Sequence, residues 1–205
     1  GMILDGEQPA GTIGGDSLAD LISRARDDEK IKSLVLRIDT GGGSTFASEI
    51  VRREIELTRK SGKPVIVSMG SVAASDGYWI ASAADEIWAS PTTITGSIGI
   101  FGAFVTFEDT LDSLGIHSDG VGTTKLADAF DPTRPLNPLL KDAWQQMIEH
   151  GYLRFIERVA EGRKMAPEDV EKIAQGRVWS GTAALNIGLI DNLCTLQEAV
   201  DAAAD

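Results

Sequence analysis

Two stretches of the chain decide its fold: residues 31–43 read IKSLVLRIDTGGG, and residues 64–77 read PVIVSMGSVAASDG. Each stretch begins with a short run dense in Val, Leu and Ile and continues into a loop that contains glycine. Such runs are typical of strands that are buried on both faces of a parallel sheet. We therefore predict strands over 31–38 and 64–69, the second one ended by Gly70, each with a loop at its carboxyl end.

Helical patterns alternate with these strands. Asp16 can cap a helix whose apolar positions Leu18, Leu21, Ile22 and Ala25 have the spacing of one buried face. Further helices are expected over 46–60, 73–84 and 108–114, and further strands over 87–89 and 98–105. This alternation predicts βαβ units around a mainly parallel sheet, and hence an α/β fold.

The last third of the chain reads differently. After a proline-marked linker over 131–138, apolar residues at helical spacing between 147 and 159 predict one long helix, followed by helices from Pro167 and over 196–203. We therefore expect an α/β core over about 1–130 and a helical C-terminal part over about 136–205.

Composition narrows the function. The chain has 205 residues, 42% of them hydrophobic and 24% charged, which is typical of a soluble globular protein. Its net charge of −12 argues against a nucleic-acid partner. One cysteine, Cys194, excludes an internal disulfide. The longest apolar run, 98–105, is far shorter than the roughly 20 residues of a membrane span. Gly1 before Met2 suggests a cloned fragment of a longer chain.

The two glycine loops are the candidate site. Because both follow parallel strands, we expect them to meet at one edge of the sheet. Residues 41–43 are either a flexible turn or a loop that presents backbone N–H groups to a ligand. Ser75, at the start of a predicted helix, is either an N-cap or a nucleophile beside backbone amides that hold an oxyanion.

A nucleophilic serine needs a base. The two histidines, His117 and His150, lie outside the glycine loops, so a Ser-His-Asp triad is poorly supported. A lysine serves only when neutral, which requires its pKa to fall from about 10.4 to about 7–8 through burial. Lys125 lies among small and apolar residues and is the candidate, the alternative being a solvated surface group. No ligand pattern predicts a metal or another cofactor.

Several motifs together carry a resemblance to a known family. One motif is Gly-Gly-Ser over 42–44, which follows a predicted strand. The others are the segments 63–70, 73–80, 95–102, 172–181 and 188–191. With them the chain resembles peptidase family S49, the signal peptide peptidases, over almost its whole length. The resemblance implies a ClpP/crotonase-like α/β fold and a serine endopeptidase with a Ser-Lys dyad. The implied substrates are short apolar peptides, the remnants of cleaved signal peptides.

The resemblance also implies roles for single residues. Ser75 matches the nucleophile, and Ser97 matches the serine that hydrogen-bonds the catalytic lysine. The loop at Gly42 and Gly43, together with the amide of Asp76, matches the oxyanion donors. Lys125 falls where short members with a single repeat carry the base.

The chain departs from the family at two positions, since Gly41 replaces the usual proline of the glycine loop and Asp76 replaces the usual glycine after the nucleophile. Long members contain two repeats, the first giving the lysine and the second the serine. Residues 1–205 look most like the second repeat, so the alternative base is a lysine of an absent N-terminal repeat.

The family further implies a homo-oligomer and a full-length protein anchored in the inner membrane of the cell envelope through segments absent from this soluble fragment. Its catalytic part would lie outside the cytoplasm or at the membrane face. Two other functions stay open: a crotonase-type acyl-CoA enzyme on the same superfold, and an assembly domain that is inactive without a lysine from the missing repeat.

Overall fold

The computed structural model describes residues 1–9 and 11–204, which form two compact units. The first unit comprises residues 1–99 and the C-terminal part from Arg154, and the second comprises residues 100–153. The first unit contains β1 (Ile3–Leu4), β2 (Ile13–Gly14), α1 (Gly15–Asp27), β3 (Leu34–Thr40), α2 (Thr45–Lys60), β4 (Val65–Ala74), α3 (Asp76–Ala81), β5 (Glu86–Ala89), β6 (Ile94–Gly96), α6 (Pro167–Ile173), β7 (Val178–Ser180), α7 (Gly181–Asn186), β8 (Asn192–Leu193) and α8 (Leu196–Ala204).

Strand β4 is the centre of the main sheet. It pairs in parallel with β3 along one side, and on its other side with β5 at Ile66–Ser68 and with β6 at Val72–Ala74. Strand β8 extends the sheet in parallel beyond β5, whereas β7 adds an antiparallel edge beyond β6. The sheet is therefore mainly parallel, as the alternation of strands and helices predicted.

The end of β4 differs from the prediction. The strand continues through Gly70 to Ala74, and its pairing with β3 shifts there, since Ile38 pairs with Met69 but Thr40 pairs with Ala73. A Cβ at Gly70 would lie 2.6 Å from Cγ of Asp39, so only glycine admits this approach. Val72 N donates to Oδ1 of Asp39 at 3.0 Å. Because Ala73 and Ala74 belong to the strand, the helix expected over 73–84 shortens to α3.

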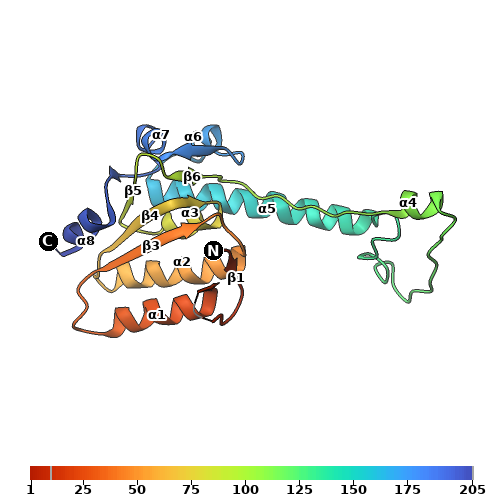
Figure 1. Cartoon of the computed structure of the whole chain (residues 1–205), viewed down its shortest axis with the longest axis horizontal. Helices are drawn as coiled ribbons and strands as arrows, with labels where there is room; N and C mark the ends of the chain where they lie inside the picture. Colours follow the sequence, from red (N-terminus) through yellow and green to blue (C-terminus); the bar gives the residue numbers. More distant parts are fainter. Residues whose placement is uncertain (10, 205) are drawn as a thin grey trace. The chain divides into compact units, whose positions relative to one another are not determined.

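Helices α1 and α2 lie side by side on one side of β3 and β4 (Figure 1). Ala47, Val51 and Ile55 of α2 are fully buried at a spacing of four residues, which is one helical face. Asp16 is not the cap of α1: the cap position is Gly14, and Asp16 lies in the first turn, where a negative charge favours a helix N-terminus. Leu21, expected in the core, is exposed.

The C-terminal part closes the core of the first unit. Phe155, Ile156 and Val159 are buried in the last turns of α5 (Pro138–Arg163), which begins in the second unit. The ring of Trp79 in α3 lies 4.8 Å from that of Phe155. Tyr78 is fully buried, its hydroxyl donates to Leu189 O at 2.7 Å, and burial raises its pKa.

The second unit holds α4 (Glu108–Ser113) and the first part of α5. The prediction of a strand over 98–105 is wrong. Ile98 O still accepts from Gly176 N at 2.9 Å, but the residues that follow are not part of the sheet. Trp144 stacks edge-on with Phe104 at 5.3 Å between ring centroids, but many large apolar side chains of this unit are exposed, among them Phe101 at 91%.

Within the described residues, no helix has both the length and the apolar character that crossing a membrane requires.

Candidate active site

Ser75 occupies the junction between β4 and α3. Its backbone has φ 52° and ψ −122°, a left-handed conformation that is costly for any residue other than glycine. The turn is anchored on both sides, because Ser75 N donates to Gly96 O at 2.9 Å and Ser75 O accepts from Tyr78 N at 2.8 Å. Such strain at a strand-to-helix turn is typical of a side chain held for function rather than for folding.

Two other serines of the chain show what an N-cap looks like. Ser44 and Ser180 have extended backbones, and their hydroxyls accept from Ala47 N and Ala183 N, each at 3.2 Å. Ser75 has a strained backbone, and its side chain makes no capping hydrogen bond. Ser75 therefore occupies the N-cap position of α3 without capping it through its side chain, which leaves the hydroxyl available.

The two glycine loops meet at Ser75, as their positions after parallel strands predicted. A Cβ at Gly42, whose φ is 117°, would lie 3.0 Å from Cβ and 3.3 Å from Oγ of Ser75. The loop is fixed from behind by β1, since Ile3 N donates to Gly42 O at 3.1 Å and Ser44 N donates to Ile3 O at 2.9 Å. The backbone of this loop is thus held directly against the serine hydroxyl.

The close approach of Gly42 gives a testable prediction. Gly42→Ala is expected to lower the rate of Ser75 acylation by about 100-fold, because a side chain there clashes with Ser75 and strains a left-handed residue, which displaces the loop, and misplacing one oxyanion donor costs about that much. Gly41→Ala is the matched control, since Gly41 has an ordinary φ and no atom within 4 Å of its Cβ position. Equal rates in both variants would contradict a role for the Gly42 backbone.

The amides of the glycine loop have side-chain partners. Gly42 N donates to Oγ1 of Thr40 at 3.1 Å, and Gly43 N donates to Oδ2 of Asp76 at 3.2 Å. Burial raises the pKa of the Asp76 carboxyl, although the hydrogen bonds from Gly43, Thr45 and its own amide oppose this. The sequence analysis did not identify Thr40. The only sign of its role in the sequence is a hydroxyl side chain two residues before Gly42, whose amide donates to that hydroxyl.

Ser97 lies beside Ser75 because of strand register. Ala74 of β4 pairs in parallel with Gly96 of β6, so the two residues that follow, Ser75 and Ser97, leave the sheet together. Ser97 also has a positive φ, 51°, and its N–H donates to Arg177 O at 2.7 Å. The structure therefore brings five of the six predicted site residues together in the first unit: Gly42, Gly43, Ser75, Asp76 and Ser97.

Lys125 belongs to the second unit. Its side chain is exposed, and its carbonyl accepts from Nδ2 of Asn137 at 2.8 Å. It lines a cavity of about 540 Å³ together with the carboxylates of Asp119, Asp128 and Asp131. Small and apolar residues also line this cavity, but Lys125 itself is exposed, so the burial that a neutral lysine needs is not present within its own unit.

Several lysines of the first unit bond to groups away from Ser75. Nζ of Lys63 donates to Asp28 O at 2.7 Å, that of Lys172 to Asp169 at 2.8 Å, and that of Lys32 to Glu29 O at 2.7 Å. Among the described residues of this unit, no hydrogen bond joins a lysine to Ser75 or Ser97.

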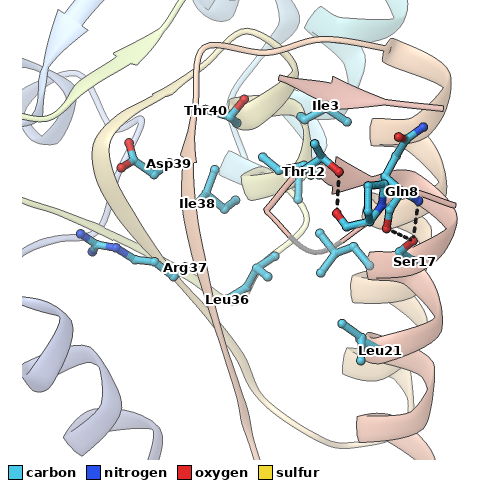
Figure 2. A pocket seen from close by; sticks show the side chains of 15 residues that line it. Ile3, Gln8, Thr12, Ser17, Leu21, Leu36, Arg37, Ile38, Asp39 and Thr40 are labelled. Atoms are coloured by element: carbon cyan, nitrogen blue, oxygen red, sulfur yellow. Dashed lines mark hydrogen bonds between the residues drawn. The ribbon is translucent and has the colours of Figure 1, made fainter. Parts of the chain in front are cut away.

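A separate apolar pocket of about 430 Å³ lies between α1 and β3. In Figure 2, Leu36 and Ile38 point into it from β3, whereas Arg37 and Asp39 of the same strand point away. Leu21 of α1 lines the same pocket, which accounts for its exposure. Ser75 is not among the lining residues, so this apolar pocket is distinct from the candidate active site.

Comparison with known proteins identifies the family of the chain. A model of peptidase family S49 matches residues 57–205. The chain is 51% identical over its full length to Protease 4 of Salmonella typhi and 50% identical over 99% of its length to Protease 4 of Haemophilus influenzae. It is also 37% identical, over 94% of its length, to the chloroplastic serine protease SPPA of Arabidopsis thaliana.

The chain spans about a third of the length of these curated relatives: 33%, 33% and 28%. Among solved structures, a ClpP1 mutant from Listeria monocytogenes aligns with a TM-score of 0.62 over 97% of this chain and 92% of its own, at 13% identity. That likeness establishes a ClpP-like fold. Since the family model covers well over half of the sequence, the chain belongs to peptidase family S49.

Proposed function

We propose that the chain is the nucleophile-bearing part of a serine endopeptidase that hydrolyses short apolar peptides, such as the remnants of cleaved signal peptides. The observation that carries the proposal is the backbone of Ser75: a strained serine at a strand-to-helix turn that caps nothing and faces the Gly42 loop. Membership of family S49 and the protease names of the relatives support the same reaction.

In this mechanism, Oγ of Ser75 attacks the carbonyl carbon of the peptide bond while a neutral lysine takes the hydroxyl proton. The resulting oxyanion receives hydrogen bonds from amides of the Gly42–Gly43 loop and of Asp76. The lysinium then gives its proton to the leaving amine, and a water molecule, deprotonated by the lysine, releases the acyl group. Ser97, beside Ser75, orients the lysine through its hydroxyl.

The lysine is either Lys125 or a residue from the rest of a longer protein. Lys125 is exposed within its unit, and Lys63 and Lys172 of the first unit bond to other groups. These observations support a lysine from the rest of a longer protein, and Lys125 remains the candidate within residues 1–205. The relatives' threefold length is consistent with a two-repeat protein in which one repeat supplies the base. In such a protein, membrane anchoring at the cell envelope would belong to segments outside residues 1–205.

A fluorophosphonate probe tests the proposed nucleophile, because it phosphonylates an activated serine and displaces fluoride. We expect labelling of the chain that mass spectrometry places on Ser75. Binding of an acyl-CoA thioester without phosphonate labelling would favour the crotonase-type alternative instead. A longer chain that reacts while residues 1–205 alone do not would favour the half-enzyme alternative.

Self-association is the second part of the proposal. The second unit exposes an unusual number of large apolar side chains, including Phe101, Val105, Leu114, Val121 and Phe130. Exposed large apolar side chains in such number are a feature of protein interfaces when they form a common surface. Enclosing several Ser75 sites in one assembly would restrict substrates to unfolded peptides.

Phe101→Glu is expected to shift the chain from oligomer towards monomer in sedimentation velocity, because a charge cannot be buried unpaired at an apolar interface. We expect at least a tenfold weaker association. Asp142→Lys on the exposed surface of α5 is a control for a change in charge alone. A wild-type chain that stays monomeric at high concentration would contradict association through this unit.

A further inference from the structure

The side chain that follows the nucleophile bonds to the loop expected to bind the oxyanion. Asp76 is only 7% exposed, and its Oδ2 accepts from Gly43 N at 3.2 Å. The Thr45 hydroxyl and the amide of Asp76 itself also stabilise the carboxylate. An amide of the glycine loop thus donates to the side chain that follows the nucleophile, in the way that backbone amides bind an anion.

This arrangement conflicts with acylation. The tetrahedral oxyanion needs unpaired N–H donors about 3 Å away, whereas the carboxylate already accepts from the Gly43 amide. A carboxylate that stayed in place would also repel a second negative oxygen a few ångströms away, in a site where water screens the charges poorly. The carboxylate must therefore move away or become neutral before the oxyanion forms.

We propose that Asp76 is an internal occupant of the oxyanion-binding loop and that it slows acylation of Ser75. The inference rests on the proposed function and adds to it a residue that sets how reactive the nucleophile is. Burial, which disfavours the charged carboxylate, is the feature that makes departure or protonation accessible. A peptide carbonyl entering the site competes directly with this side chain for the same amides.

A contrary role is conceivable on the same contacts. If the carboxylate braces the glycine loop in a productive position, its removal would lower the rate instead of raising it. Asp76→Asn keeps the size of the side chain and removes its charge, and Asp76→Gly removes the side chain altogether. The two variants together separate charge from bracing, and a fold defect in one leaves the other informative.

The experiment measures phosphonylation of Ser75 by a fluorophosphonate probe, resolved into the maximal rate and the half-saturating probe concentration. We expect both Asp76 variants to raise the maximal rate at least tenfold, with less than a threefold change in half-saturation. Asp39→Asn is the matched control. The Asp39 carboxylate accepts from Val72 N, and the substitution removes one charge at the same sheet edge without changing the hydrogen bond of Gly43. We expect its rate to stay within twofold of wild type.

Unchanged or lower maximal rates in both Asp76 variants, with clear labelling of wild type, would overturn this inference and leave the proposed nucleophile standing. Absence of Ser75-dependent labelling in wild type and every variant would overturn the proposed function and this inference together. A rate increase of the same size in Asp39→Asn would reduce the effect to general electrostatics and would also overturn it.

Discussion

Ser75→Ala is expected to lower peptide hydrolysis by at least 10,000-fold while leaving the protein folded. Oγ of Ser75 is the proposed nucleophile beside the Gly42 loop, so its loss removes the covalent route through the acyl-enzyme. The measurement is turnover of a fluorogenic apolar peptide, in the longer chain if residues 1–205 alone are inactive, with thermal unfolding as a check on folding.

Ser180→Ala is the matched control, because Ser180 occupies the same kind of position at the start of α7 but caps it through Ala183 N. This variant should keep full turnover and lose about 1 kcal/mol of the free energy of unfolding. Retained hydrolysis in Ser75→Ala would exclude Ser75 as the nucleophile.

The backbone of Ser75 adds a second, opposite effect. Ser75→Gly should also abolish hydrolysis, yet it should raise the free energy of unfolding by roughly 1 kcal/mol, because glycine adopts a φ of 52° without the strain. A variant that is more stable but inactive would show that the backbone strain at Ser75 lowers the stability of the fold and serves the active site.

Much of this arrangement could be predicted from the sequence. The Val-Ile-Val-Ser run is buried on both faces as the centre of the parallel sheet, whereas the neighbouring strand buries Leu36 and Ile38 and exposes Arg37; the carboxyl ends of the two strands bring Gly42 and Ser75 together. The helix over 46–60 was predicted to within one residue of α2, because its apolar positions and the stop at Gly62 and Pro64 agree.

The errors have specific physical causes. Glycine usually ends a strand, but Gly70 serves close packing against Asp39, and no local pattern distinguishes the two roles. The run 98–105 has the composition of a strand. A strand forms only where it pairs with a neighbouring strand, and within the described residues this run has no such partner after Ile98.

Backbone strain and side-chain partners are likewise invisible in a single sequence. The φ of Ser75 depends on the register between Ala74 and Gly96, and the contact from Gly43 to Asp76 depends on two loops that are more than 30 residues apart. The resemblance to family S49 identified Asp76 as unusual, but only coordinates give its carboxylate a partner.

Lys125→Ala is expected to lower turnover by about 1,000-fold or more if Lys125 is the base, because general-base catalysis and activation of Ser75 are lost together. Lys125→Arg should be equally inactive, since arginine stays protonated near neutral pH and cannot take the hydroxyl proton. Both variants should unfold at the wild-type temperature, because the side chain of Lys125 is exposed within its unit. Lys141, an exposed lysine of α5 in the same unit, gives the matched control Lys141→Ala, which should keep full turnover.

The rival source of the base predicts a different pattern. If a lysine from an absent repeat serves Ser75, residues 1–205 alone are inactive, Lys125→Ala changes nothing, and the longer chain hydrolyses peptide with or without Lys125. Activity that disappears in Lys125→Ala of both the short and the long chain would instead assign the base to Lys125. The exposure of Lys125 in its own unit distinguishes the two possibilities further, because a lysine that serves as a base must be buried and Lys125 is not buried within its own unit. Assembly that buries the exposed apolar side chains of the second unit would also cover Lys125. If Lys125 is the base, activity should therefore fall in parallel with oligomer content in Phe101→Glu. If a lysine of another repeat is the base, activity should not follow oligomer content in this variant.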